Sequence, residues 1–243
     1  METSRESSYA WLQVPAAMLL LLGGCVLFLM PASTSHSYKK TQTLNNLRNV
    51  AIATQAYATA YNGRIPAGGS PDDSLPYWSW QTELLPYLEQ QAAYRAIDFT
   101  RAWNSPENQK PLSMNLAIFQ SAAESARRPV DGYGVTHFTA NSRLFGAREG
   151  VRFDEVSSKD GSTVTLMMGE IGSAFPPWAR PGNSRDPARG LGGGPDQFGN
   201  SQGTRCAVMF LGGNGRHLDP KLSPRVLELL ADPDNGVPAD DEF

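Results

Sequence analysis

The chain has 243 residues and a nearly balanced charge, with 21 Lys and Arg against 24 Asp and Glu and a net charge of −3. This length predicts a folded domain with a core large enough to need no disulfide or metal. The mildly acidic balance gives no basic footprint for nucleic acid, so we expect no nucleic-acid partner. Two cysteines and three histidines exclude a disulfide scaffold and a cysteine-based zinc cage, and we expect no metal or other cofactor.

The first element in chain order is a long uncharged segment. Residues 11–31 read WLQVPAAMLLLLGGCVLFLMP, which is about the ~20 residues that a helix needs to cross a bilayer core. Its ten Leu, Val and Phe residues outweigh the single polar Gln13 on an insertion scale. We therefore predict a transmembrane helix at residues 11–31, preceded by a cytoplasmic tail at residues 1–10.

Three interpretations of this segment remain open: a retained signal anchor, a cleaved signal peptide and a lipoprotein signal. We favour the signal anchor, because one Arg against two Glu in the first ten residues is a weak start for a cleaved signal peptide. Leu22-Gly23-Gly24-Cys25 looks like a lipobox, but the apolar run continues beyond Cys25, so we interpret Cys25 as an apolar residue of the span. Charge alone determines the orientation poorly, because Arg5 and the amino terminus compete with Lys39, Lys40 and Arg48 on the other side of the span. Counting positive charges mildly favours a cytoplasmic C-terminal part.

Residues 38–62 predict an amphipathic helix that follows the span almost directly. Gly63 provides a C-terminal stop, with Pro66 beyond it. The helical spacing predicts a buried face and an exposed polar face. On the buried face we expect Leu44, Leu47, Val50, Ala51, Ala58 and Tyr61, and on the exposed face Lys40, Asn45, Arg48 and Asn49.

The rest of the chain predicts short helices and then strands. Residues 79–99 predict a helical stretch that Pro86 should break, and Ser105-Pro106 and Ser223-Pro224 predict two further helix starts. β-branched and aromatic residues predict strands at 115–120, 133–141, 163–171 and 204–212. Asp-Gly pairs at 131–132 and 160–161 predict turns. In the third strand, regular alternation would place Leu166 and Met168 on one face and Thr165 and Met167 on the other.

These elements predict an α+β fold, with a long N-terminal helix packed on a small, mostly antiparallel sheet that has long loops. We expect the folded domain to span residues 38–236. The acidic tail at residues 237–243 is predicted to be disordered.

No catalytic motif stands out in the sequence. It has no nucleophile elbow, zinc-binding His-Glu-x-x-His or phosphate-binding P-loop, and the glycine-rich segment 190–199 is typical of a flexible loop. We therefore assign no catalytic, cofactor-binding or metal-binding residue and expect that the chain is not an enzyme. For several residues we weigh a functional role against a structural one and favour the structural one. These residues are His137, His217 beside Asp219, Asp72 and Asp73, the acids of 232–242, Cys206 and Glu170. Trp78, Trp80 and Trp103 could form a sugar-stacking platform, but we favour aromatic core packing for them.

Five stretches in order resemble a bacterial family, the domain of unknown function 1559, which is expanded in planctomycetes. They are residues 44–68, 79–94, 160–171, 176–183 and 218–236. The resemblance implies a pilin-like or pseudopilin-like fold, in which a long helix is half embedded in the membrane and half packed on a small antiparallel sheet.

The chain departs from the family pattern at several positions, so it looks like a divergent member. The family usually has a Cys before the Asn-Asn pair, where this chain has Thr43, and a Cys-Pro-Ser segment where it has 120–122. The tail motif of His, nine residues and Asp-Gly falls on Gln202 and 212–213. The pilin-type leader is absent, so the resemblance does not extend to a disulfide, a His–Asp pair or prepilin processing.

Two functions follow as expectations. The first is a membrane-anchored, pseudopilin-like structural or assembly protein, held in the bilayer by residues 11–31, with other pilin-like subunits as candidate partners. The alternative is an extracytoplasmic module, tethered to the membrane, that binds a solute or glycan through the tryptophans and the 176–203 loop. In both, we expect a single-pass protein of the cytoplasmic (inner) membrane with the bulk of the chain outside the cytoplasm.

Overall fold

The computed structural model describes residues 32–69, 78–124, 130–146, 149–159 and 164–234. The chain divides into two compact units, Met1–Tyr38 and Lys39–Phe243. Within the described ranges, no helix is both long and apolar enough to cross a membrane. Several sequence predictions lie outside the described residues: the tail at 1–10, the span at 11–31, Asp72 and Asp73, the turn at 160–161 and the tail at 237–243.

Helix α2, Ala32–Ala60, is the long N-terminal helix. It ends as predicted, because Asn62 and Gly63 take left-handed conformations with φ of 53° and 83° and the Gly63 N–H donates to the carbonyl of Ala58 at 2.8 Å. The predicted buried face is confirmed for Leu47, Val50, Ala51 and Ala58, and Leu44 is half-buried. Thr43 and Thr54, which were not predicted, are also buried on this face. The predicted burial of Tyr61 is wrong. The residue is 52% exposed, because it lies in the turn after the last helical residue.

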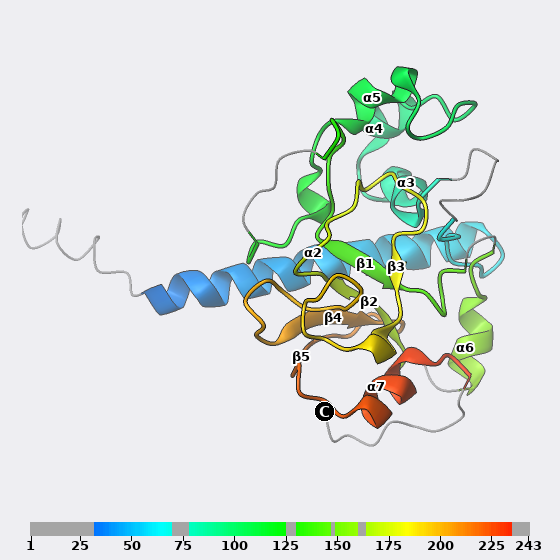
Figure 1. Ribbon diagram of the computed structural model, residues 1–243. Coiled ribbons are helices and arrows are strands. Elements are labelled where there is room, and N and C mark those ends of the chain that lie inside the picture. The colour runs from blue at the N-terminus through cyan, green and yellow to red at the C-terminus, as the bar shows by residue number, and fades with distance from the viewer. Residues whose placement is uncertain (1–31, 70–77, 125–129, 147–148, 160–163, 235–243) are drawn as a thin grey trace, which may run out of the picture. The chain divides into compact units, whose positions relative to one another are not determined.

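In the part of the chain that the structure describes, the sheet has five strands in the order β3-β1-β2-β4-β5 (Figure 1). They are β1 Phe138–Asn141, β2 Leu166–Glu170, β3 Ser184–Arg185, β4 Cys206–Phe210 and β5 Gly215–Leu218. Only the pairing of β1 with β3 is parallel, and the other three pairings are antiparallel. This mixed, mostly antiparallel sheet with α2 packed on it confirms the predicted α+β class.

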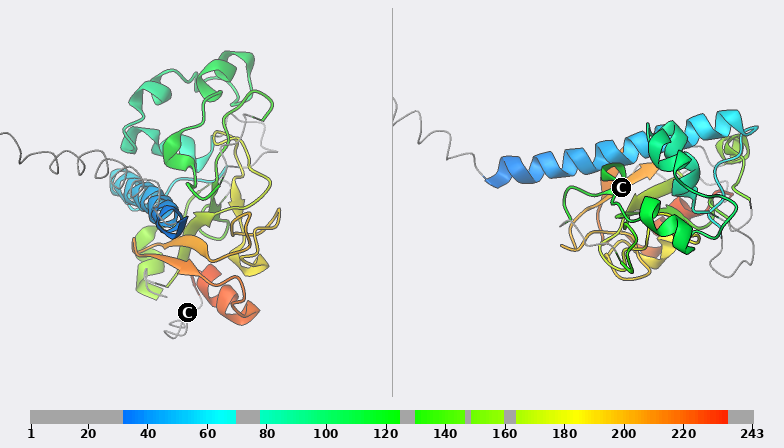
Figure 2. Two further views of the ribbon diagram at one scale, coloured as in Figure 1. Left: turned by 90° about the vertical axis from the view of Figure 1, so that its left-hand side faces the viewer. Right: turned by 90° about the horizontal axis from the view of Figure 1, so that it is seen from above.

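The two faces of the sheet lie in different apolar cores. Along β4, Ala207 and Met209 belong to the core that contains the buried face of α2. The alternate residues Cys206, Val208 and Phe210 belong to a second core with helix α7, Pro224–Ala231. In the left-hand view of Figure 2, strands of the sheet lie between α2 and the red helix α7. This period of two is the one that a strand buried on both faces requires.

The helix predictions after α2 are largely confirmed. The predicted helix at 79–99 is broken around Pro86 into α3 Trp80–Leu84, a 3₁₀ turn at Leu85–Tyr87 and α4 Gln91–Arg95. Helix α5, Pro106–Leu112, follows Ser105 as expected. Ser223 caps α7 by accepting from the N–H of Val226 at 3.3 Å.

Three strand predictions need correction. Residues 115–120 form a 3₁₀ turn at Ala117–Phe119 rather than a strand. The predicted strand at 133–141 is shorter than expected, because the N–H groups of Thr136 and His137 donate to the carbonyls of Pro176 and Phe119 and not to a neighbouring strand of the sheet. In β2, Leu166 pairs with Phe210 but Met168 pairs with Met209, so Met167 is the extra residue of a bulge. Met168 and Met167 consequently join the α2 core while Leu166 faces the other side, and the predicted alternation is wrong there. The sequence did not predict β3, β5 or helix α6, Phe153–Lys159.

Candidate functional site

His137 and His217, which the sequence analysis considered, both lie within the fold and contact neighbouring structural elements. His137 is buried, its Nδ1 accepts from the N–H of Ser121 at 3.2 Å, and its ring contacts that of Phe175 at 4.7 Å. His217 lies on β5 opposite Ala207, where burial, Lys40 and Arg205 lower its pKa. Within the described ranges, no hydrogen bond joins His217 to Asp219, whose carboxylate instead accepts from the N–H of Lys221.

The tryptophans do not form an exposed platform. Trp80 is fully buried and donates to the carbonyl of Asn183 at 2.8 Å, and Trp78 is only 7% exposed. Trp103 is half-buried against Tyr133, with ring centroids 5.1 Å apart. The structural interpretation of these rings as core residues is therefore confirmed.

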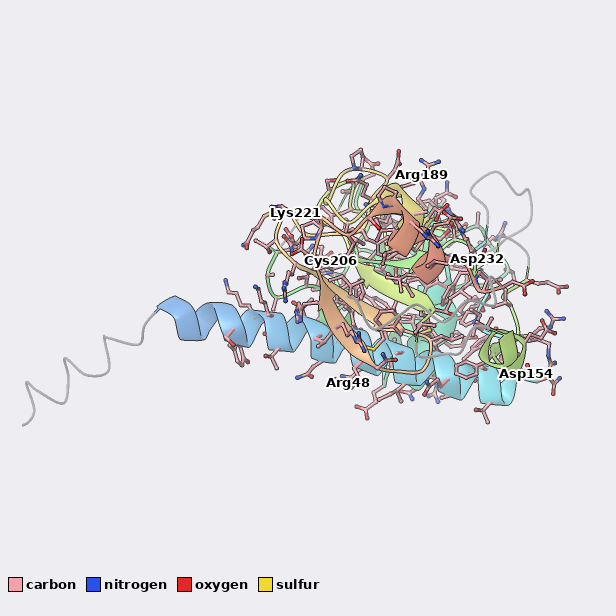
Figure 3. The ribbon with its side chains drawn as sticks, turned by 90° about the horizontal axis from the view of Figure 1, so that it is seen from below. Arg48, Asp154, Arg189, Cys206, Lys221 and Asp232 are labelled. Carbon is pink, nitrogen blue, oxygen red and sulfur yellow. The ribbon has the colours of Figure 1, made fainter. Side chains whose placement is uncertain are left out.

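Cys206, predicted as a buried strand residue, is fully buried in β4 (Figure 3). Burial raises the pKa of its thiol well above the usual range. Among the described residues, no group of three or more His, Cys, Asp or Glu side chains is placed to hold a metal ion.

A buried polar network fastens α2 to the end of β2. Glu170 is 3% exposed, and its carboxylate accepts from the N–H of Ala207 at 2.9 Å, from Asn200 at 3.3 Å and from the Ser121 hydroxyl at 3.1 Å. Burial raises the pKa of Glu170, although these three hydrogen bonds oppose the shift. The Ser121 hydroxyl lies 3.1 Å from the hydroxyl of Thr43 on α2, so the network connects helix and sheet.

This network occupies the two segments in which the family resemblance described above implies cysteines. Thr43 stands directly before the Leu-Asn-Asn sequence, and its hydroxyl also accepts from the N–H of Ala122 at 3.0 Å. Hydrogen bonds from Thr43 thus join two segments 78 residues apart in the sequence. The contact between them is non-covalent in this chain.

The opposite face of α2 is exposed and mostly polar. Its exposed residues are Thr41, Gln42, Asn45, Arg48, Asn49, Ile52, Ala56, Thr59 and Ala60. Asn45, Arg48 and Asn49 are exposed as predicted, whereas Lys40 is half-buried. Arg48 donates to the side chain of Asn45 at 3.0 Å. Ile52 is the large apolar residue of this face, 55% exposed, and it lines a groove of about 370 Å³ with Leu88 and Ile118.

A cluster of tyrosines and one carboxylate surrounds the C-terminal end of α2. The Tyr57 hydroxyl donates to the Glu83 carboxylate of α3 at 2.8 Å. The ring of Tyr61 stacks on that of Tyr57 with centroids 4.1 Å apart and an interplanar angle of 15°. Tyr87 meets Tyr57 edge-on at 5.9 Å. Burial raises the pKa of Tyr94, and the nearby Tyr61 and Glu83 add to that shift.

The tyrosine cluster borders a cavity of about 450 Å³. Tyr57, Tyr61 and Glu83 line it together with an ion pair between Arg64 and Glu149, whose charged atoms are 3.0 Å apart. Burial raises the pKa of Glu83, and the Tyr57 hydrogen bond only partly offsets this. Burial and the neighbouring Glu83 carboxylate likewise raise the pKa of Tyr57. The cavity therefore combines aromatic rings with a carboxylate that is partly withdrawn from water.

Sequence reasoning missed this cavity. Tyr57 and Tyr61 are four residues apart at the end of a predicted helix, a spacing that places two side chains on one face. That signal was available in the sequence. The pairing of Tyr57 with Glu83 was not, because it depends on how α3 packs against α2.

The chain matches a known protein family. A family model described as a protein of unknown function, DUF1559, matches residues 40–207. The chain belongs to the DUF1559 family. Searches of curated proteins and of solved structures found no match. The family resemblance is confirmed, and the matched residues include four of the five stretches, while 218–236 lies beyond them. This DUF1559 protein has a pilin-like architecture of a long N-terminal helix and a sheet.

Proposed function

We propose that this DUF1559 protein is a membrane-anchored, pseudopilin-like structural or assembly protein and not an enzyme. The observation that carries the proposal is the division of α2 into two faces. One face is buried against the sheet from Thr43 to Ala58. The other presents Arg48, Asn49 and Ile52 to solvent, which leaves these side chains available to contact neighbouring subunits.

The proposal includes a membrane anchor and an orientation. Residues 11–31 would remain as a single span in the cytoplasmic membrane, with the lipid bilayer as a partner and the bulk of the chain outside the cytoplasm. The uncharged composition of that segment supports the span, and the pilin-like architecture supports the orientation. Protease treatment of spheroplasts tests it: we expect digestion of the bulk of the chain, and protection of that part would contradict the orientation.

Crosslinking in membranes tests assembly. A photocrosslinking residue at Ile52 in the full-length protein should give specific crosslinks between copies, and Arg48→Glu should abolish them. Lys221→Glu is the matched control, because Lys221 is also exposed but lies away from α2 (Figure 3). The assembly proposal fails if the full-length protein stays monomeric at physiological concentrations, or if both variants reduce crosslinking equally.

A ligand-binding module is the second candidate function. The buried tryptophans do not favour it, because they cannot stack on a glycan from within the core. The cavity beside Tyr57, Tyr61 and Glu83 does favour it, since its volume of about 450 Å³ falls within the range of small-molecule sites, roughly 300–1,000 Å³.

A further inference from the structure

Among the described residues, no positive charge is paired with the Glu83 carboxylate. Within the part of the chain that the structure describes, its one hydrogen bond comes from the Tyr57 hydroxyl at 2.8 Å, and no Lys or Arg forms an ion pair with it. Most of the surroundings of Glu83 are protein rather than water, which raises its pKa. A partly buried carboxylate in this position is stabilised by any cation that can reach it.

Three charged residues are among the described residues that line the cavity: Arg64, Glu83 and Glu149. Arg64 is the basic residue among those that line the cavity, and its guanidinium is 3.0 Å from the Glu149 carboxylate. Arg64 also donates to the backbone carbonyl of Gly150. The Arg64 charge is thus matched locally, and among the described residues that line the cavity Glu83 adds one further negative charge.

The aromatic side chains favour the same kind of ligand. Tyr57 and Tyr61 are stacked on each other, and Tyr61 is 52% exposed, so part of its ring is open to solvent beside the cavity. The face of an aromatic ring carries negative electrostatic potential and attracts ammonium groups, an interaction worth about 0.5–2 kcal/mol. Rings and carboxylate therefore act on a cation in the same direction, whereas an anion would be repelled by both.

We propose that the cavity bounded by Tyr57, Tyr61 and Glu83 binds the alkylammonium group of a small organic ligand. Glu83 supplies the counter-charge, and the exposed ring of Tyr61 contacts the ammonium substituents. The Tyr57 hydroxyl holds the Glu83 carboxylate in position through its hydrogen bond. This site lies at the end of α2 and does not depend on assembly through the Arg48 face.

Calorimetric titration of the full-length protein in detergent micelles tests the proposal with two probes of the same shape. Choline carries the ammonium charge, and 3,3-dimethylbutan-1-ol is its neutral isostere. We expect choline to bind at least tenfold more tightly than the alcohol. Equal affinity for the two, or no saturation by choline, would overturn the proposal.

Variants then assign the interaction to residues. Glu83→Gln keeps the shape of the side chain and should weaken choline binding at least tenfold, whereas Glu89→Gln, the same change at an exposed residue outside this cavity, should leave it unchanged. If Glu83→Gln fails to fold, Tyr61 decides the matter: Tyr61→Phe should retain binding and Tyr61→Ala should lose several-fold in affinity. Unchanged affinity in Tyr61→Ala, or an equal loss in Glu89→Gln, would contradict the proposed site.

Discussion

Leu47 tests how strongly α2 is held on the sheet. The side chain is fully buried in the core that also contains Val50 and Met209. Leu47→Ala removes three carbon atoms, which costs about 2.4 kcal/mol in transfer free energy at about 0.8 kcal/mol per methylene. The cavity that remains adds to this, because packed neighbours relax only partly, so we expect a total loss of about 3–4 kcal/mol.

The assay is urea unfolding of the full-length protein in detergent micelles, followed by the fluorescence of its tryptophans. Trp80 and Trp178 are both fully buried and should report the loss of the core. Ile52→Ala is the matched control, because it removes a similar side chain from the same helix at a site that is 55% exposed; we expect a change within about 0.5 kcal/mol. Equal effects of the two substitutions would refute the assignment of the buried and exposed faces of α2.

Three further predictions concern other parts of the chain. The double variant Thr43→Cys, Ser121→Cys should form a disulfide, because the two hydroxyls are 3.1 Å apart. Closing this loop should stabilise the oxidised protein by up to about 4 kcal/mol relative to the protein reduced with dithiothreitol. Absence of the bond under oxidising conditions would contradict the geometry. Burial raises the pKa of Glu170 above its ordinary value of 4.5, so the folded state binds the proton more tightly than the unfolded state, and the contribution of Glu170 to stability should fall as pH rises through the raised pKa. Glu170→Gln should therefore flatten the dependence of the urea midpoint on pH above 4.5. An unchanged slope would contradict this prediction. Cys25→Ser should leave membrane association unchanged, since we expect Cys25 to lie within an apolar span; release of the variant into the soluble fraction, or palmitate labelling of the wild type, would favour the lipoprotein interpretation.

Elements that depend on local chemistry were predictable from the sequence. The end of α2 at Gly63 follows from a left-handed conformation that glycine adopts without strain. The start of α7 follows from Ser223, whose hydroxyl accepts from the backbone within the first turn. Pro86 interrupts the helical stretch at 79–99 because its ring is incompatible with a continuous helix. In each case one or two neighbouring residues contain the physical cause.

Elements that depend on distant partners were not predictable. Strand β5, with the sequence Gly-Arg-His-Leu, is short and polar, and it is a strand because it pairs along β4. The bulge at Met167 arises from the pairing of β2 with β4, which periodicity within β2 cannot indicate. The candidate site has the same character, since Tyr57 and Glu83 are 26 residues apart and belong to different helices.

The two ends of α2 in the described domain depend on different interactions, which makes the proposed functions separable. Near its start in this domain, Thr43 is fixed by hydrogen bonds to Ser121 and Ala122, while at its end Tyr57 is fixed by Glu83. A substitution on the exposed face, such as Arg48→Glu, changes neither set of contacts. It should therefore reduce crosslinking between copies and leave both choline affinity and stability intact. Tyr61→Ala should lower choline affinity and leave crosslinking between copies intact. A variant that lost assembly and ligand binding together would show that the two surfaces are coupled through the helix.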